Sequence, residues 1–229
     1  MRGILYGIGV GPGDPELMTL KAARILRACD VVAAPQSAGN DKTAMAIAAG
    51  FVEGKPVLYL DMPMTRDKAQ MDQSHDAAAG RICQLLDEGK TVAFLTLGDP
   101  SIYSTYWYVH KRVLARGYDA QLVPGVPSFC AAAAAANTAL VEGSEMLHII
   151  PASHDSTDEG LSLPGAKVLM KAGRSILQVR DKLRAQGKLN QAVLVERATM
   201  DGQRVVRDLD ALDDPTGYFS IILVKEGQR

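Results

Sequence analysis

The chain has 229 residues, of which 47% are hydrophobic, and its 25 basic and 26 acidic side chains leave a formal net charge of −1. This composition supports a sizeable core and excludes a disordered chain, and the lack of net positive charge argues against nucleic acid or an anionic membrane as a partner. The three cysteines, Cys29, Cys83 and Cys130, show neither disulfide nor zinc spacing, so we expect a cytoplasmic protein without a bound metal.

The first half of the chain alternates short apolar runs with helical patterns. Its predicted strands are Ile4–Gly9, Val31–Ala34, Val57–Leu60, Val92–Leu97 and Ala120–Val123. Its predicted helices are Pro15–Cys29, Lys42–Phe51, Asp67–Glu88 and Tyr103–Arg116. This alternation is typical of a mostly parallel sheet with helices on its faces, so we expect an α/β domain over residues 1–123.

From residue 124 onward the predicted strands come closer together. They are Leu147–Ile150, Val168–Met170, Ala192–Val195, Arg204–Arg207 and Tyr218–Val224. An alanine-rich helix after residue 128 and a helix at Ser175–Ala185 accompany them, Gly202 is expected in a hairpin turn, and His154–Pro164 is expected to be an exposed loop. Residues 124–229 therefore form a predicted second domain with a mixed sheet.

The first candidate ligand loop is GIGVGPGDPELMTLKA at residues 7–22, between a predicted strand and a predicted helix. It does not match the dinucleotide fingerprint GxGxxG, because the third glycine position is Pro12 or Asp14 depending on where the pattern starts. Its glycines would let the backbone approach a ligand, and Asp14 and Pro15 would begin the following helix.

A second loop, FLTLGDPSIYST at residues 94–105, again follows a buried strand, and the carboxyl end of a central strand is where open α/β sheets bind ligands. Asp99 could instead only cap the helix that contains Tyr103. In a third segment, VPGVPSFCAAAA at 123–134, Ser128 is a candidate helix cap. The signatures GxSxG and HExxH are absent, and the four histidines show no ligand spacing, so the sequence favours neither a serine hydrolase nor a metal site.

Taken in this order, the three motifs resemble those of the tetrapyrrole (corrin/porphyrin) methyltransferases. The opening YGIGVGPGDPELMTLKA and the TLGDPSIYST segment are most similar to the C20-methyltransferases of precorrin-2 and cobalt-factor II (cobalt-precorrin-2), enzymes of cobalamin biosynthesis. The resemblance implies a two-lobed fold with a cleft between the lobes, a homodimer, S-adenosylmethionine (SAM) as cosubstrate and no metal. On this chain the implied SAM contacts are Gly98, Asp99, Pro100, Ser101, Ile102, Ser104, Thr105, Ser128, Phe129, Met170, Arg197, Ala198, Ser220 and Ile221.

The implied substrate is a tetrapyrrole, whose acetate and propionate groups need basic partners. Residues expected to face it are Val10, Gly11, Pro12, Gly13, Asp14, Arg66, Lys68 and Lys171. Methyl transfer to a meso carbon also releases a proton, for which Asp99 and Tyr103 are candidate bases. Three alternatives stay open: another position on the ring, a protein or RNA substrate, and a noncatalytic module that binds SAM or a tetrapyrrole.

Overall fold

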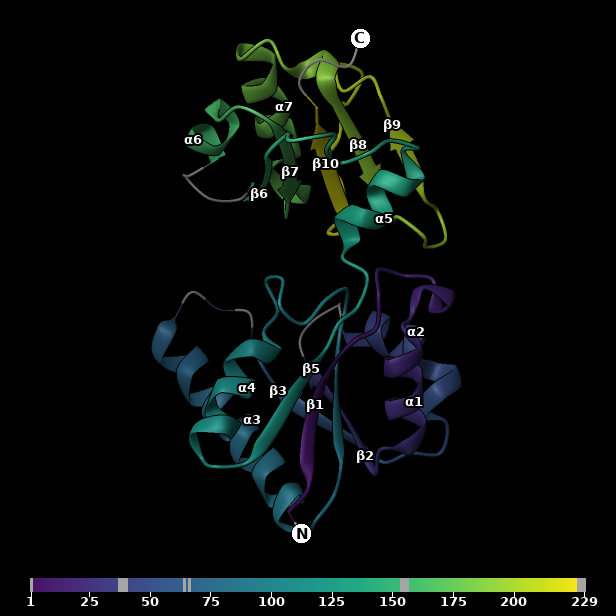
Figure 1. Cartoon of the computed structure of the whole chain (residues 1–229). Coiled ribbons are helices and arrows are strands. Elements are labelled where there is room, and N and C mark those ends of the chain that lie inside the picture. Colours follow the sequence, from purple (N-terminus) through teal and green to yellow (C-terminus); the bar gives the residue numbers. More distant parts are fainter. Residues whose placement is uncertain (1, 37–40, 64, 66, 153–156, 226–229) are drawn as a thin grey trace. The chain divides into compact units, whose positions relative to one another are not determined.

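The computed structural model describes residues 2–36, 41–63, 65, 67–152 and 157–225, and the chain divides into two compact units (Figure 1). Unit 1 spans Met1–Pro127 and unit 2 spans Ser128–Arg229, so the division falls after Pro127, whereas the sequence pattern changes after residue 123. Each unit contains one five-stranded sheet.

The sheet of unit 1 is entirely parallel, with strand order β3-β2-β4-β1-β5. Its strands are β1 (Ile4–Gly9), β2 (Val31–Gln36), β3 (Val57–Asp61), β4 (Val92–Thr96) and β5 (Asp119–Val123). All five residues of β4 are buried, as the continuous apolar run predicted for a strand covered on both faces. The predicted parallel α/β architecture is therefore confirmed.

Helices cover both faces of this sheet (Figure 1). On one face, α1 (Leu20–Ala28) and α2 (Asp41–Val52) enclose a core that includes Ile8, Leu26 and Ile47. On the other, α3 (Lys68–Asp87) and α4 (Tyr106–Ala115) enclose a second core that includes Leu5, Ile82 and Phe94. Adjacent side chains of one strand point to opposite faces, so β1 supplies Leu5 to one core and Ile8 to the other.

Two helices of unit 1 begin later than the sequence predicted. Asp14 and Pro15 begin only a short 3₁₀ helix (Pro15–Leu17), and α1 starts after Thr19, whose side chain accepts a hydrogen bond from the Ala22 backbone nitrogen. The fourth helix starts at Tyr106 instead of Tyr103, because Tyr103 has a φ of 48°, which is incompatible with a right-handed helix. In both cases a local hydroxyl cap, from Thr19 or from Ser104, fixes the start.

The sheet of unit 2 is mixed, as predicted, with order β6-β7-β10-β8-β9. Its strands are β6 (Leu147–Pro151), β7 (Ala166–Met170), β8 (Ala192–Glu196), β9 (Arg204–Val206) and β10 (Ser220–Val224). Only β6 and β7 pair in parallel; β10 lies between β7 and β8 and is antiparallel to both. The β8–β9 pair forms the expected hairpin, and Gly202 has the positive φ (77°) that its turn requires.

Unit 2 contains the helices α5 (Ser128–Ala135), α6 (Thr157–Ser162) and α7 (Ile176–Ala185), with short 3₁₀ helices at Gly173–Ser175 and Leu189–Gln191. The prediction of an exposed loop over His154–Pro164 is wrong where the chain is described, because α6 lies within it. Thr157 and Leu161 of α6 are buried, and Leu161 belongs to the core of unit 2. Across the described residues, no helix is long and apolar enough to cross a membrane.

Candidate functional site

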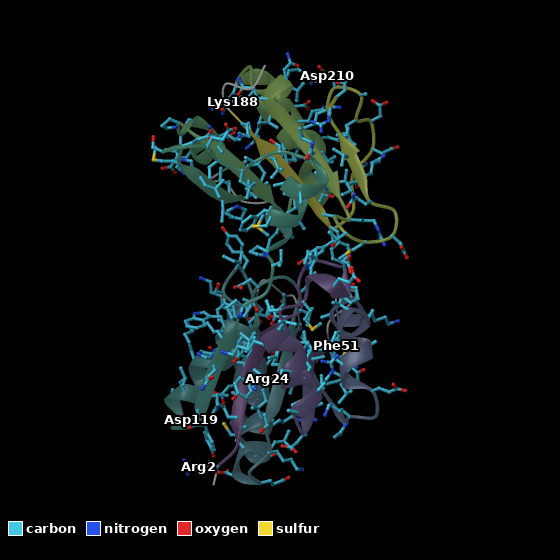
Figure 2. All side chains as sticks on the ribbon, turned by 45° about the vertical axis from the view of Figure 1, so that its right-hand side comes forward. Arg2, Arg24, Phe51, Asp119, Lys188 and Asp210 are labelled. Atoms are coloured by element: carbon cyan, nitrogen blue, oxygen red, sulfur yellow. The ribbon has the colours of Figure 1, made fainter. Side chains whose placement is uncertain are left out.

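The loops that follow β1 and β4 leave neighbouring strands toward opposite faces of the sheet. From β1 the chain runs to α1 on one face, and from the adjacent β4 it runs to α4 on the other. Such a point at the carboxyl ends of parallel strands is where open α/β sheets bind ligands. The opposite, amino-terminal edge is marked in Figure 2 by Arg2, just before β1, and Asp119, the first residue of β5.

Three glycine-containing segments meet at this carboxyl edge. The Gly98 backbone nitrogen donates to the Gly11 oxygen at 2.8 Å, and the Gly11 nitrogen donates back to the Gly98 oxygen at 3.3 Å. A Cβ atom on Gly9 would lie 2.6 Å from both the Gly98 oxygen and the Gly125 nitrogen, and one on Gly125 would lie 2.2 Å from the Gly98 oxygen. The approach of these backbones therefore requires glycine at positions 9 and 125.

Asp99 connects the second loop to the third segment by a hydrogen bond. Its Oδ1 atom accepts hydrogen bonds from the Ser101 backbone nitrogen (2.8 Å) and hydroxyl (2.5 Å), and its Oδ2 atom accepts one from the Gly125 nitrogen at 3.0 Å. Asp99 thus caps no helix. The first turn of α4 is capped instead by Ser104, whose hydroxyl accepts from the Tyr106 nitrogen at 3.1 Å and lies 3.4 Å from the Thr96 hydroxyl.

The remainder of the second loop is only partly exposed. Gly98 and Pro100 are buried, Ile102 is half-buried, and Ser101 and Thr105 are exposed. Tyr103 has a left-handed backbone, unusual for a residue other than glycine, and its side chain is 47% exposed. Residues in such backbone conformations cluster at functional sites, where the surrounding structure maintains them.

The first loop offers less surface than the sequence suggested. Val10, Gly11 and Pro12 are buried, and the Val10 side chain belongs to the core beneath α1. Gly13 and Asp14 are half-buried, and the Asp14 carboxylate accepts a hydrogen bond from the Glu16 nitrogen at 2.8 Å. Of the predicted substrate-facing segment 10–14, only these last two positions retain partial exposure.

Behind the second loop, a buried tyrosine and histidine connect α4 to the sheet. The Tyr106 ring lies against Gly7 of β1, where a Cβ atom would come within 2.0 Å of it. Its hydroxyl lies 2.9 Å from Nδ1 of His110, and both side chains are buried. Burial raises the pKa of Tyr106 and lowers the pKa of His110. We therefore assign the tyrosine as the hydrogen-bond donor to a neutral imidazole.

Two exposed aromatic rings on α4, neither of which was predicted from the sequence as a site residue, stack on histidines. Trp107 stacks on His110 with ring centroids 5.1 Å apart, and Tyr108 stacks on the buried His75 of α3 at 4.9 Å. Burial, with the nearby Arg112, lowers the pKa of His75. The available signal was the consecutive Tyr-Trp-Tyr directly after the GDP loop, in a chain with only 5% aromatic residues.

In unit 2 the predicted SAM contacts gather at one edge of the mixed sheet. Strands β7 and β8 end where β10 begins, and the register pairs Met170 with Ile221 and Glu196 with Ser220. Arg197 and Ala198 directly follow β8. The Arg197 nitrogen donates to the Phe219 oxygen at 2.8 Å, and the Ser220 hydroxyl donates to the Gly217 oxygen at 2.7 Å.

This edge also carries backbone strain. Lys171, Arg197 and Thr199 all have positive φ values, of 60°, 51° and 65°, although none is glycine. Lys171 directly follows β7, and Arg197 and Thr199 lie within three residues after the end of β8. Loss of hydration around its ammonium group lowers the pKa of Lys171. Strain of this kind, at the end where distant segments converge, is typical of ligand sites.

The remaining predicted residues are more scattered. Ser128 is the first residue of α5, and Phe129 beside it is buried. Lys68 is the exposed first residue of α3. Arg66 lies outside the described residues. Within the described ranges, no group of three or more histidine, cysteine, aspartate or glutamate side chains is arranged to hold a metal ion.

Residues 4–212 match the family model described as Tetrapyrrole (Corrin/Porphyrin) Methylases. The chain belongs to this family. Over 97% of its length it is 35% identical to the precorrin-2 C(20)-methyltransferase of Sinorhizobium sp, of which it covers 95%. It is also 32% identical to the cobalt-precorrin-2 C(20)-methyltransferase of Salmonella typhimurium, covering 99% of this chain and 98% of that protein.

Another relative is longer than this chain. The cobalamin biosynthesis protein CobIJ of Mycobacterium tuberculosis is 38% identical over the whole of this chain, which spans only 47% of that relative. Among solved structures, a cobalt precorrin-4 methyltransferase, CbiF, superimposes with a TM-score of 0.75 at 24% identity, over 97% of this chain and 94% of that one. This likeness supports the family fold.

Proposed function

We propose that the chain transfers a methyl group from SAM to C20 of precorrin-2 or of its cobalt complex, in cobalamin biosynthesis. The observation that carries this proposal is the 35% identity to a precorrin-2 C(20)-methyltransferase over nearly the full length of both chains. The contact of the three glycine segments at the carboxyl edge of unit 1 supports it, because those segments contain the family motifs.

In this proposal, unit 1 supplies Gly98–Ile102, Ser104 and Thr105 to SAM. The exposed polar groups of Ser101 and Thr105 suit contact with a polar cosubstrate. The family resemblance also implies candidate SAM contacts among the residues of unit 2. These are Ser128, Phe129, Met170, Arg197, Ala198, Ser220 and Ile221.

The tetrapyrrole would be met by the first loop, Val10–Asp14, chiefly through its backbone and through Gly13 and Asp14. The basic groups proposed for its carboxylates are Lys68, which is exposed, Lys171 and Arg66. Lysine at position 171 suits this role because a nearby carboxylate would restore the charge stabilisation that its ammonium group has lost by desolvation.

Methyl transfer from SAM depends mainly on how the two reactants are oriented. The sulfonium of SAM is already activated, so the residues around it align the methyl group with C20 and exclude water. The carboxylate of Asp99 already accepts three hydrogen bonds, and we therefore assign it a positioning role instead of proton abstraction. Tyr103 is the remaining candidate for relaying the C20 proton to water, because its phenol is exposed beside the loop.

We further propose a cytoplasmic homodimer that acts on a small molecule, without nucleic acid, membrane or protein-bound metal. The balanced charge supports this, because binding to nucleic acid or an anionic membrane is usually driven by a basic surface. Light scattering of the purified protein would test the dimer. A monomer at micromolar concentration would contradict it.

The decisive test is an anaerobic incubation with methyl-labelled SAM and either precorrin-2 or its cobalt complex. Mass spectrometry and carbon NMR should show one added methyl group at C20, and the preferred substrate would distinguish the metal-free from the cobalt pathway. A methyl group at another ring carbon would move the assignment elsewhere in the family. No methylation of either compound would overturn the proposal.

A further inference from the structure

We propose that the exposed indole of Trp107, together with the exposed rings of Tyr103 and Tyr108, which are close to it in the sequence, is a contact surface for the face of the tetrapyrrole macrocycle. This aromatic surface, defined as these three side chains, rests on the proposed function and adds to it Trp107 and Tyr108, two substrate contacts that lie outside the family motifs. It lies entirely in unit 1, at the loop after β4 and the first turn of α4.

The aromatic surface is unusual in its exposure. Trp107 is 42% exposed and Tyr108 is 46% exposed, although large aromatic side chains bury most of their area in folded proteins. The two rings and Tyr103 occur within six consecutive residues, immediately after the GDP loop. We take these exposed apolar rings beside a ligand loop as a candidate ligand contact.

The Trp107 ring is fixed from beneath. It stacks nearly parallel on His110, with an interplanar angle of 17°, and His110 is in turn held by the Tyr106 hydroxyl. Tyr106 itself packs on Gly7 of the central strand β1. A continuous set of contacts therefore connects the sheet to the exposed indole. Such preorganisation lowers the entropy lost when a ligand covers the ring.

Tyr108 is supported in the same way by α3. Its ring is parallel to that of His75, with an interplanar angle of 0°. The ammonium group of Lys111 lies 5.5 Å from the centroid of the Tyr108 ring. Arg112, by contrast, is already engaged by Asp72 and Asp76. Lys111 is thus an exposed cation beside the aromatic surface that is not drawn into this ion-pair cluster.

The ligand chemistry that fits is a large flat conjugated ring with carboxylates at its rim. Aromatic faces stack on the ring, and a cation at the margin, such as Lys111, pairs with a carboxylate. A precorrin has both features. SAM has neither a large conjugated ring system nor several carboxylates, so the aromatic surface should discriminate between the two ligands.

The test compares Trp107→Ala, Trp107→Phe and a matched control, Leu114→Ala, which removes an equally exposed apolar side chain from the last turn of the same helix. Binding of precorrin-2, and separately of S-adenosylhomocysteine, is measured anaerobically by calorimetry. Trp107→Ala should weaken precorrin-2 binding by about tenfold or more, and Trp107→Phe should restore most of it, because a stacked aromatic ring is retained. Leu114→Ala should bind both ligands as the wild type does.

Steady-state kinetics supply the second readout. Trp107→Ala should raise KM for the tetrapyrrole with KM for SAM unchanged. Trp107 is also the single tryptophan of the chain, so its fluorescence reports directly on shielding of the indole by bound precorrin-2 from a soluble quencher such as acrylamide.

The outcomes separate this inference from the proposed function. If the wild-type protein binds no tetrapyrrole, the proposed function itself is overturned. If the wild type binds precorrin-2 and Trp107→Ala binds it equally well, the inference is overturned while the function stands. Equal loss of precorrin-2 and S-adenosylhomocysteine affinity in Trp107→Ala would also overturn it, since the ring would then support the SAM loop. If the three side chains instead bind another protein, Trp107→Ala would leave the precorrin-2 affinity unchanged, and the inference would be overturned.

Discussion

The Oδ2 atom of Asp99 lies 3.0 Å from the backbone nitrogen of Gly125, 26 residues further along the chain. Through this contact a single carboxylate fixes the loop after β4 against the segment that ends unit 1. Since the same carboxylate also orders Ser101, the loop conformation depends on its negative charge.

Replacing Asp99 with alanine should therefore disorder the loop and weaken SAM binding by about tenfold to a hundredfold, the equivalent of about one hydrogen bond to a charged group. Calorimetric titration with SAM measures it. Asp99→Asn should show a smaller loss, because the amide oxygen can still accept from one partner. An unchanged affinity in Asp99→Ala would remove the carboxylate from any role in the site.

Gly125→Ala should disturb the same loop from the other side. Its methyl group would lie 2.2 Å from the Gly98 oxygen, a backbone atom that cannot move without shifting the loop. We expect the free energy of unfolding to fall by about 1–3 kcal/mol, measured by urea denaturation, with weaker SAM binding.

The matched control is Gly80→Ala, in the interior of α3, where an added Cβ meets nothing within 4 Å. Because alanine is the better helix former, this change should stabilise the protein by about 0.5–1 kcal/mol. A neutral Gly125→Ala would mean that the three segments are less closely packed than described.

Tyr106→Phe should lower stability by about 1–3 kcal/mol, because it removes a buried hydrogen bond and leaves Nδ1 of His110 without it. Tyr108→Phe is the control, since its exposed ring is held by stacking on His75. The emission of Trp107 should also change in Tyr106→Phe, because the ring stacked beneath the indole loses its anchor. Equal stabilities of the two variants would contradict the buried bond.

Stability should also fall as the pH is lowered below about 6.5, the ordinary pKa of histidine. Burial lowers the pKa of His75 and of His110 in the folded state, so in this range the unfolded chain binds more protons than the folded one. The loss should reach at most about 1.4 kcal/mol per pH unit for each histidine and should end once the folded state is protonated as well.

Urea denaturation at pH 7.5, 6.5 and 5.5 measures this slope. The double variant His75→Gln, His110→Gln should be less stable at pH 7.5 but should show a flatter dependence over the same interval. A slope that survives in the double variant would place the titrating groups elsewhere.

Much of the fold was predictable, because the central strands of unit 1 (β1, β2 and β4) are short apolar runs that are largely buried. Helix starts were harder to predict. The periodic pattern placed two starts at Pro15 and Tyr103, several residues too early, because the deciding feature was a hydroxyl cap further along the chain, at Thr19 or Ser104. Helix α6 was missed because its sequence, TDEGLS, is mostly polar and contributes only Leu161 to the apolar core.

For the site, the glycine loops were visible in the sequence because glycine has few other reasons to recur so densely. The partner of Asp99 was not, since nothing local indicates a contact 26 residues away. The stacking of Trp107 and Tyr108 on histidines was also hidden, because it depends on how α4 lies beside α3 and on which face of each helix is buried.

The strand order of unit 1 has a consequence for how the chain folds during synthesis. Strand β1 emerges first, yet it lies between β4 and β5, and its residue Leu5 pairs with Val92 and with Ala120. During synthesis β1 therefore stays unpaired on both edges until β4 and β5, and with them most of unit 1, have left the ribosome. Such distant pairing makes folding slow, and an unpaired apolar strand is prone to aggregate. Expression at low temperature, or with chaperones that shield nascent strands, should accordingly raise the soluble yield.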